Sequence, residues 1–194
     1  MRRGYQILMA MALLLMAHAS QAHTFGAHGA GLAAGLAHPF LGLDHLLAML
    51  ALGIWAVAQG GRAVWFVPAV FLGIMMIGAL LAWGEITVPL IEAGIIGSVL
   101  ILGWLIGFPV RLSLAVCVGL AGVLALFHGY SHGMEMPQAA SAIQYGLGFL
   151  VSSGLLLLAG VRFGRWIMFR GWQVWLRPGG ITLVATAVVM SAGS

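Results

Sequence analysis

Six apolar stretches dominate this chain, and they constrain its fold more than any other feature. We predict helices over residues 38–58, 64–84, 88–107, 112–131, 139–161 and 178–193. The first five reach the roughly 17–25 residues that cross a hydrocarbon layer about 30 Å thick, whereas the last is short. Only 6% of the residues are charged, against about 25% in a soluble domain. The expected fold is therefore an all-α polytopic membrane helical bundle of about six transmembrane helices.

The N-terminal residues have the pattern of a cleavable secretory signal. Arg2 and Arg3 precede an apolar core over residues 7–17, which is too short to span a bilayer comfortably. Ser20 and Ala22 then supply the small residues of a cleavage site at positions −3 and −1. We predict a signal peptide over residues 1–22 and a single transmembrane helical domain over residues 23–194. An uncleaved first helix is the alternative.

The remaining arginines orient the predicted spans. All of them fall in the first, third and fifth connections: Arg62, Arg111, Arg162, Arg165, Arg170 and Arg177. Cytoplasmic connections are enriched in Arg and Lys, so these connections are expected to face the cytoplasm of a bacterial inner membrane. The mature N-terminus is then periplasmic, in agreement with the signal peptide. The basic composition does not indicate nucleic-acid binding, because no polar domain presents these arginines as a surface.

Tryptophans and glycines fit the same fold. Four tryptophans lie near predicted span ends, where an indole prefers the membrane interface: Trp55, Trp65, Trp83 and Trp104. Two glycine pairs, Gly103/Gly107 and Gly160/Gly164, have the spacing that lets helices approach closely, although glycine is abundant throughout the chain. Residues 162–172 combine arginines with aromatic residues and are predicted to lie at the cytoplasmic interface.

Ionisable side chains inside a membrane are costly, so each marks a candidate site. Two clusters lie at the periplasmic ends of the first and fourth predicted spans: His38, Asp44 and His45, and then His128, His132 and Glu135. In the second cluster the spacings of four and three residues place all three side chains on one helix face. In the first cluster, Pro39 and Gly42 favour an irregular helix start that could fold His38 back toward Asp44.

Imidazole and carboxylate groups together indicate a divalent-metal site. The single cysteine, Cys117, lies in an apolar run, so no thiolate cluster is expected. Nitrogen and oxygen ligands without thiolate suit Ni²⁺, Co²⁺, Zn²⁺ or Cu²⁺ rather than Mg²⁺ or Cu⁺. His23, as a new N-terminus, and Glu92 are additional candidates with fewer features in their favour. His28 is either a capture ligand or a bystander, and no prosthetic group is expected.

The two clusters also carry a family resemblance. The run HPFLGLDHLLAM, residues 38–49, resembles the HPxxGxDHxxAM signature of the HupE/UreJ family of nickel and cobalt permeases. The run FHGYSHGMEMP, residues 127–137, resembles that family's second motif, with Ser131 in place of the usual alanine. The resemblance implies uptake of Ni²⁺, or of Co²⁺, across the inner membrane to supply hydrogenase or urease maturation. It also implies that the six clustered residues bind the ion.

The two clusters are also compatible with three other classes of protein. An intramembrane zinc hydrolase would use the same clusters, with Glu135 as general base. A haem-binding subunit would use paired histidines but would leave Asp44 and Glu135 without a role. A metal sensor would bind without transport. We expect a permease and not an enzyme, embedded in the lipid bilayer. The sequence is also compatible with a homo-oligomer and with contacts to hydrogenase or urease accessory proteins.

Overall fold

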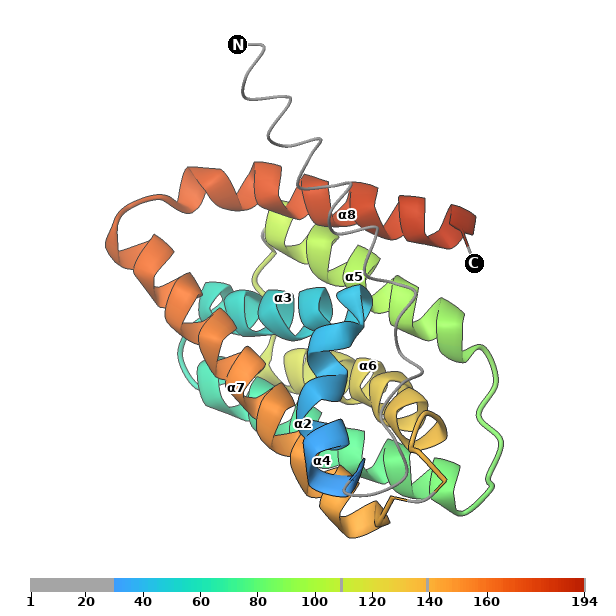
Figure 1. Cartoon of the computed structure of the whole chain (residues 1–194). Coiled ribbons are helices and arrows are strands. Elements are labelled where there is room, and N and C mark those ends of the chain that lie inside the picture. The colour runs from blue at the N-terminus through green and yellow to red at the C-terminus, as the bar shows by residue number, and fades with distance from the viewer. Residues whose placement is uncertain (1–29, 109, 139, 194) are drawn as a thin grey trace, which may run out of the picture.

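The computed structural model describes residues 30–108, 110–138 and 140–193. The predicted signal peptide, His23 and His28 lie outside this part of the chain. The described residues form helices and no strand, in the order α2 (Ala30–Leu41), α3 (Leu43–Gln59), α4 (Ala63–Trp83), α5 (Ile91–Gly107), α6 (Leu114–Met134), α7 (Ala142–Phe169), the 3₁₀ turn η1 (Gln173–Trp175) and α8 (Leu176–Gly193). The predicted all-α class is confirmed (Figure 1).

The lengths and composition of these helices are those of a multi-pass membrane protein. Among the described residues, four helices are long and apolar enough to cross a membrane: α4, α6, α7 and α8 together with η1. The bent pair formed by α2 and α3 qualifies as a fifth if it is counted as one span. The third predicted span corresponds to α5, whose 17 residues stand at the lower limit for crossing the hydrocarbon layer.

The first predicted span is broken into two helices. The sequence predicts one helix over residues 38–58, but α2 and α3 meet at Gly42 with a bend of 78°. Pro39 lies in the last turn of α2 and cannot donate a backbone hydrogen bond, which favours the end of a helix there. Gly42 has an extended backbone and precedes the first turn of α3. The irregular helix start that Pro39 and Gly42 favour is therefore present, and His38 lies on the short helix before it.

The fifth predicted span is longer than expected. The prediction ends it at residue 161, whereas α7 continues to Phe169 and contains 28 residues. Arg162 and Arg165 lie within this helix and do not interrupt it. At about 1.5 Å per residue, these 28 residues are longer than a hydrocarbon layer of about 30 Å, so α7 is long enough to extend beyond this layer. The predicted interfacial segment over residues 162–172 is thus mostly the last two turns of a spanning helix.

Glycines set the distances between neighbouring helices. A Cβ added to Gly53 of α3 would collide with the backbone of α7, and one added to Gly129 of α6 would collide with the Met75 backbone of α4. The Gly103/Gly107 and Gly160/Gly164 pairs also face neighbouring helices, the first α8 and the second α3, and the approach is closest at Gly103 and Gly160. Close backbone approach through small residues is a common way to associate helices in membranes.

The same contacts give the direction of each helix pair. Gly122, Gly129 and Gly133 of α6 meet α4 in ascending order of residue number, so α4 and α6 run parallel. Gly160 and Gly164 of α7 likewise meet α3 in ascending order, so α3 and α7 run parallel, whereas α5 and α8 run antiparallel. These directions agree with six spans that alternate in orientation along the chain.

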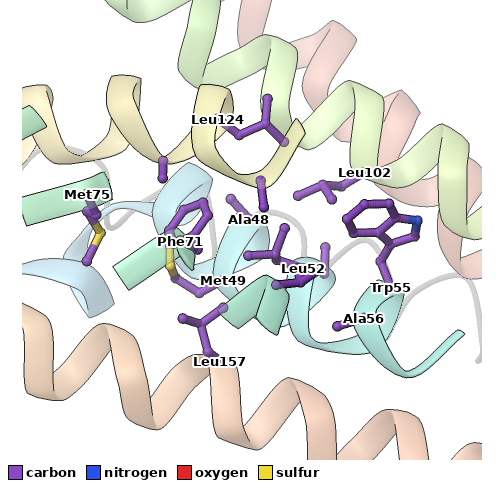
Figure 2. Packing of buried hydrophobic residues seen from close by; sticks show 14 of the residues in the cluster. Ala48, Met49, Leu52, Trp55, Ala56, Phe71, Met75, Leu102, Leu124 and Leu157 are labelled. Atoms are coloured by element: carbon purple, nitrogen blue, oxygen red, sulfur yellow. The ribbon is translucent and has the colours of Figure 1, made fainter. Parts of the chain in front are cut away.

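Helix α3 occupies the centre of the bundle, between α4, α5 and α7. Figure 2 shows its side chains meeting Phe71 of α4, Leu102 of α5 and Leu157 of α7, all of which are buried. Trp55 is fully buried in this core, so its predicted place at the membrane interface is wrong. Trp65 and Trp104, in contrast, are more than half exposed near helix ends, as an interfacial position requires.

Candidate metal site

Four imidazoles gather where α2, α3 and α6 meet. His38 comes from the last turn of α2, His45 from the first turn of α3, and His128 and His132 from the last two turns of α6. His45 is at the centre: its ring centroid lies 4.5 Å from that of His132, 4.9 Å from that of His128 and 6.2 Å from that of His38. The two predicted clusters, 83 residues apart between His45 and His128 in the chain, therefore form one group.

Each acid of the group is paired with a histidine. The His45 Nδ1 lies 2.9 Å from Oδ1 of Asp44, which also accepts a 2.8 Å hydrogen bond from the His45 backbone N–H. The His38 Nε2 lies 3.2 Å from Oε2 of Glu135, and the Ser131 hydroxyl donates to Oε1 of the same carboxylate at 2.7 Å. The bend between α2 and α3 is what brings His38 to Glu135 at the end of α6.

Glu135 follows the last residue of α6, and its side chain is half exposed. Partial burial acts to raise the pKa of this carboxyl group, but the hydrogen bond and electrostatic interaction with His38, with the hydrogen bond from Ser131, act in the opposite direction and prevail. The pKa of Glu135 is therefore below its ordinary value. This carboxylate supplies negative charge at the exposed edge of the imidazole group.

Aromatic side chains close the apolar side of the group. Phe149 of α7 stacks on His132 with ring centroids 5.0 Å apart and planes 11° apart. The ring of Phe71 in α4 lies 5.8 Å from that of His128, and the ring of Tyr145 in α7 lies 5.8 Å from that of His38. His128 and His132 are completely buried. These contacts add α4 and α7 to the three helices that carry the imidazoles.

Several buried ring nitrogens of this group have no hydrogen-bond partner among the described residues. They are Nε2 of His45, Nδ1 of His128 and both ring nitrogens of His132. A buried polar atom without a partner costs about 1–3 kcal/mol, so such atoms are rare unless they serve a purpose. In the part of the chain that the structure describes, no three His, Cys, Asp or Glu side chains already surround a common point as metal ligands. Ion binding would therefore require the rings to turn.

The structure does not bring every sequence candidate into this group. Glu92 is exposed in the first turn of α5, and its side chain makes no hydrogen bond or ion pair with another described residue. Glu85 is likewise exposed, in the loop before α5. His23 lies outside the described residues. The roles of Glu92 and His23 stay predictions.

Sequence reasoning did not place Ser98 in the site. This residue of α5 is fully buried, and its Oγ lies 2.7 Å from Nε2 of His128. Its position in an otherwise apolar stretch of α5 is a usable signal, because a buried hydroxyl needs a partner. Which partner it finds depends on the packing of α5 against α6, which one sequence does not reveal.

The arginines gather at the opposite end of the bundle. Arg111 donates to the backbone oxygen of Gln59 at the end of α3. Four other guanidinium groups lie over aromatic rings. Among them, Arg165 of α7 is 5.0 Å from the ring of Trp65, and Arg177 of α8 is 5.5 Å from the ring of Phe108. Because His45 lies in the first turn of α3 and Gln59 ends this helix, the imidazoles and the arginines lie at its two ends. The predicted separation of the clustered acids and histidines from the arginines is confirmed for the described residues.

Comparison with known proteins identifies the family of the chain. The family model for the HupE / UreJ protein matches residues 10–190. The chain belongs to the HupE/UreJ family. It is 42% identical to Protein HupE of Rhizobium leguminosarum bv. viciae over 163 residues, which cover 81% of this chain and 83% of that protein. No solved structure matches the chain.

Membership in the HupE/UreJ family decides between two of the hypotheses drawn from the sequence. HupE/UreJ proteins are permeases and not enzymes. The alternative of an intramembrane zinc hydrolase is therefore unsupported. The family match extends over both histidine motifs, so the imidazole group lies in the part of the chain that the family shares.

Proposed function

We propose that this HupE/UreJ protein is an inner-membrane permease that takes up Ni²⁺, or Co²⁺, from the periplasm. The observation that carries the proposal is the group of three buried imidazoles, His45, His128 and His132, whose ring nitrogens include four without partners among the described residues. Imidazole nitrogens are good ligands for both ions, and a bound cation would satisfy the lone pairs that burial leaves unpaired. Family membership supports transport as the purpose of the binding.

The carboxylates supply the charge that attracts a cation. Asp44 and Glu135 lie beside the imidazoles, and both side chains are partly exposed. They would lower the energy of a divalent cation that approaches from water, before it loses its hydration shell. Binding must be strong enough to remove this water and weak enough to allow release toward the other side. The gathering of arginines at the far end supports a cytoplasmic location for that end, by the positive-inside rule.

The cargo would supply the maturation of a hydrogenase or a urease. Support for this part of the proposal comes from the family resemblance and from similarity to Protein HupE. The ion is a substrate here, and no prosthetic group is included. Selection between Ni²⁺ and Co²⁺ depends on the geometry that the rings adopt around the ion, because both ions accept the same ligands.

Radiometal uptake into cells tests this function. Cells that produce the protein should accumulate ⁶³Ni²⁺, and excess Co²⁺ and a protonophore added in parallel report on selectivity and on the driving force. His45→Ala and His132→Ala should each remove most of the uptake at equal amounts of protein in the membrane. Glu85→Gln, which neutralises an exposed acid outside the group, is the control. Uptake at the wild-type rate by both histidine variants would contradict the proposed site.

A further inference from the structure

The hydrogen bonds around the imidazoles specify which ring nitrogen each histidine can offer to an ion. We propose that the ion is held by ring nitrogens alone, through Nδ1 of His128, Nε2 of His45 and a nitrogen of His132, while Ser98 and Asp44 are positioning residues that fix the tautomers. This inference rests on the proposed function and deepens it, because it assigns the ligand atoms and two residues that act through others.

The Ser98 hydroxyl determines the tautomer of His128. Its single hydrogen is donated to the backbone oxygen of Ile95, 2.6 Å away in the same helix. Ser98 Oγ can therefore only accept at its 2.7 Å contact with Nε2 of His128, so the proton of the neutral ring must be on Nε2. The lone pair is then on Nδ1, which is buried and has no partner among the described residues.

The Asp44 carboxylate determines the opposite tautomer for His45. An ionised carboxylate only accepts hydrogen bonds, so Nδ1 of His45 must be the donor in the 2.9 Å contact with Oδ1. The lone pair of His45 is then on Nε2, again a buried atom for which the described residues offer no partner. The backbone N–H of His45 donates to the same oxygen and holds the carboxylate in place.

Groups that orient ligand histidines through the other ring nitrogen are a common feature of metal sites. Here the rings of His45 and His128 lie 4.9 Å apart at 84° and offer different nitrogens, each held by its own anchor. Because no three ligand-type side chains among the described residues surround a common point yet, the rings must turn on binding. The bonds to Ser98 and Asp44 restrict each ring to one available nitrogen while it does so.

A set of nitrogen ligands also narrows the class of cargo. Imidazole sites favour Ni²⁺, Cu²⁺, Zn²⁺ and Co²⁺, whereas Mg²⁺ and Mn²⁺ prefer oxygen ligands. If Asp44 and Glu135 were ligands themselves, Mn²⁺ would be a better competitor. The proposal therefore predicts that Mn²⁺ competes poorly with Co²⁺ for the purified protein.

The test measures Co²⁺ binding to the purified full chain in detergent, by its affinity and by its visible ligand-field spectrum. Ser98→Ala removes the acceptor for Nε2 of His128 and should weaken Co²⁺ binding by about 10–100-fold, with a changed spectrum. Ser152→Ala is the matched control, because Ser152 is an equally buried serine of α7 whose hydroxyl donates to backbone oxygens and to no imidazole. Its affinity and spectrum should equal those of the wild type.

A pair of amide substitutions distinguishes ligation from a merely structural role. The side-chain oxygen of Asn comes near the place of Nδ1, and that of Gln near the place of Nε2. His128→Asn should therefore bind Co²⁺ more tightly than His128→Gln, and the order should be reversed for His45→Asn and His45→Gln. Loss of a structural hydrogen bond alone would not produce this reversal.

The outcomes separate the two proposals. Wild-type affinity and spectrum in Ser98→Ala, or the opposite order in the amide pairs, would overturn the ligand assignment while leaving uptake intact. Mn²⁺ competing as well as Ni²⁺ would overturn the nitrogen-only ligand set. A wild-type protein that binds neither Co²⁺ nor Ni²⁺ would overturn the proposed function, and the ligand assignment with it.

Discussion

Each of the two acids in the site is paired with a histidine, and the two pairs form in different ways. Asp44 contacts the histidine that follows it in sequence, so this pair forms within one helix turn. Glu135 instead joins the end of α6 to His38 on α2, so its contact depends on how two helices are placed. Substitution of Glu135 should therefore remove a negative charge and also free the end of α6 from its contact with α2.

The first prediction concerns Glu135 and its second partner, Ser131. Glu135→Ala removes the contact with His38 and a negative charge at the exposed edge of the site, so metal uptake should fall about tenfold or more. Ser131→Ala removes one of the hydrogen bonds to a half-exposed carboxylate that water can replace, so uptake should stay within about twofold of the wild type. Radiometal uptake at equal expression measures both. Equal losses in the two variants would contradict this ranking.

At the scale of helices, the bend between α2 and α3 and the contact between α4 and α6 position the site. A Cβ on Gly42 would lie 2.9 Å from Oδ1 of Asp44 and 3.0 Å from Nδ1 of His45, the two atoms of one hydrogen bond. Gly129, next to His128, lies against the backbone of Met75. Small residues therefore stand directly beside ligand candidates on both helices.

Gly42→Ala should disturb the site more than the fold. The φ of Gly42 is −90°, which any residue adopts, so the backbone itself tolerates alanine. The new methyl group must displace Asp44 or His45, and we expect a several-fold weaker affinity for Co²⁺ with thermal unfolding within a few degrees of the wild type. Gly73→Ala is the control, because a Cβ at that position of α4 contacts nothing. An unchanged affinity for Co²⁺ in Gly42→Ala would contradict this prediction, because Asp44 and His45 would then move aside without loss of binding.

Gly129→Ala should disturb the fold itself. A methyl group here overlaps the backbone of α4, which cannot move aside as a side chain can, so α4 and α6 must separate. Overpacking of this kind costs about 1–3 kcal/mol, and it should appear as a lower unfolding temperature in detergent. Gly119→Ala in the same helix meets no atom and should be neutral or slightly stabilising. A wild-type unfolding temperature in Gly129→Ala would contradict the close contact.

Some features of the fold and of the site can be predicted from the sequence, whereas others depend on helix packing. The apolar runs predict the helices because bilayer thickness imposes a length that hydropathy makes visible. Pro39 and Gly42 predict an irregular start, but the 78° bend depends on how α2 packs against α7. The four site histidines are found because ionisable groups are rare in apolar runs. Contacts from Ser98, Phe71 and Phe149 are set by helix packing, which no local pattern in one sequence records.

At the scale of the whole molecule, charge is divided between two ends. Arginines gather where α3, α5 and α7 end, whereas the imidazoles, Asp44 and Glu135 lie at the beginning of α3 and the end of α6. The parallel and antiparallel helix pairs also require that successive spans alternate in direction. Charge and packing are independent here, because the contacts that give the helix directions involve no charged side chain. Both give one arrangement of the chain, with the imidazole end opposite the arginine end.

Accessibility of introduced cysteines would test the orientation of that arrangement in the membrane. Cys117 is the single cysteine and is buried, so Cys117→Ala provides a background without native thiols. Ile86→Cys, in the exposed loop between α4 and α5, lies at the imidazole end, and Val174→Cys, in η1, lies at the arginine end. A membrane-impermeant maleimide added to cells with a permeabilised outer membrane should label Ile86→Cys. It should label Val174→Cys only after the inner membrane is opened, because the arginine connections are expected in the cytoplasm. The reverse pattern would place the imidazole group on the cytoplasmic side and turn the proposed uptake into export, with the same residues binding the ion.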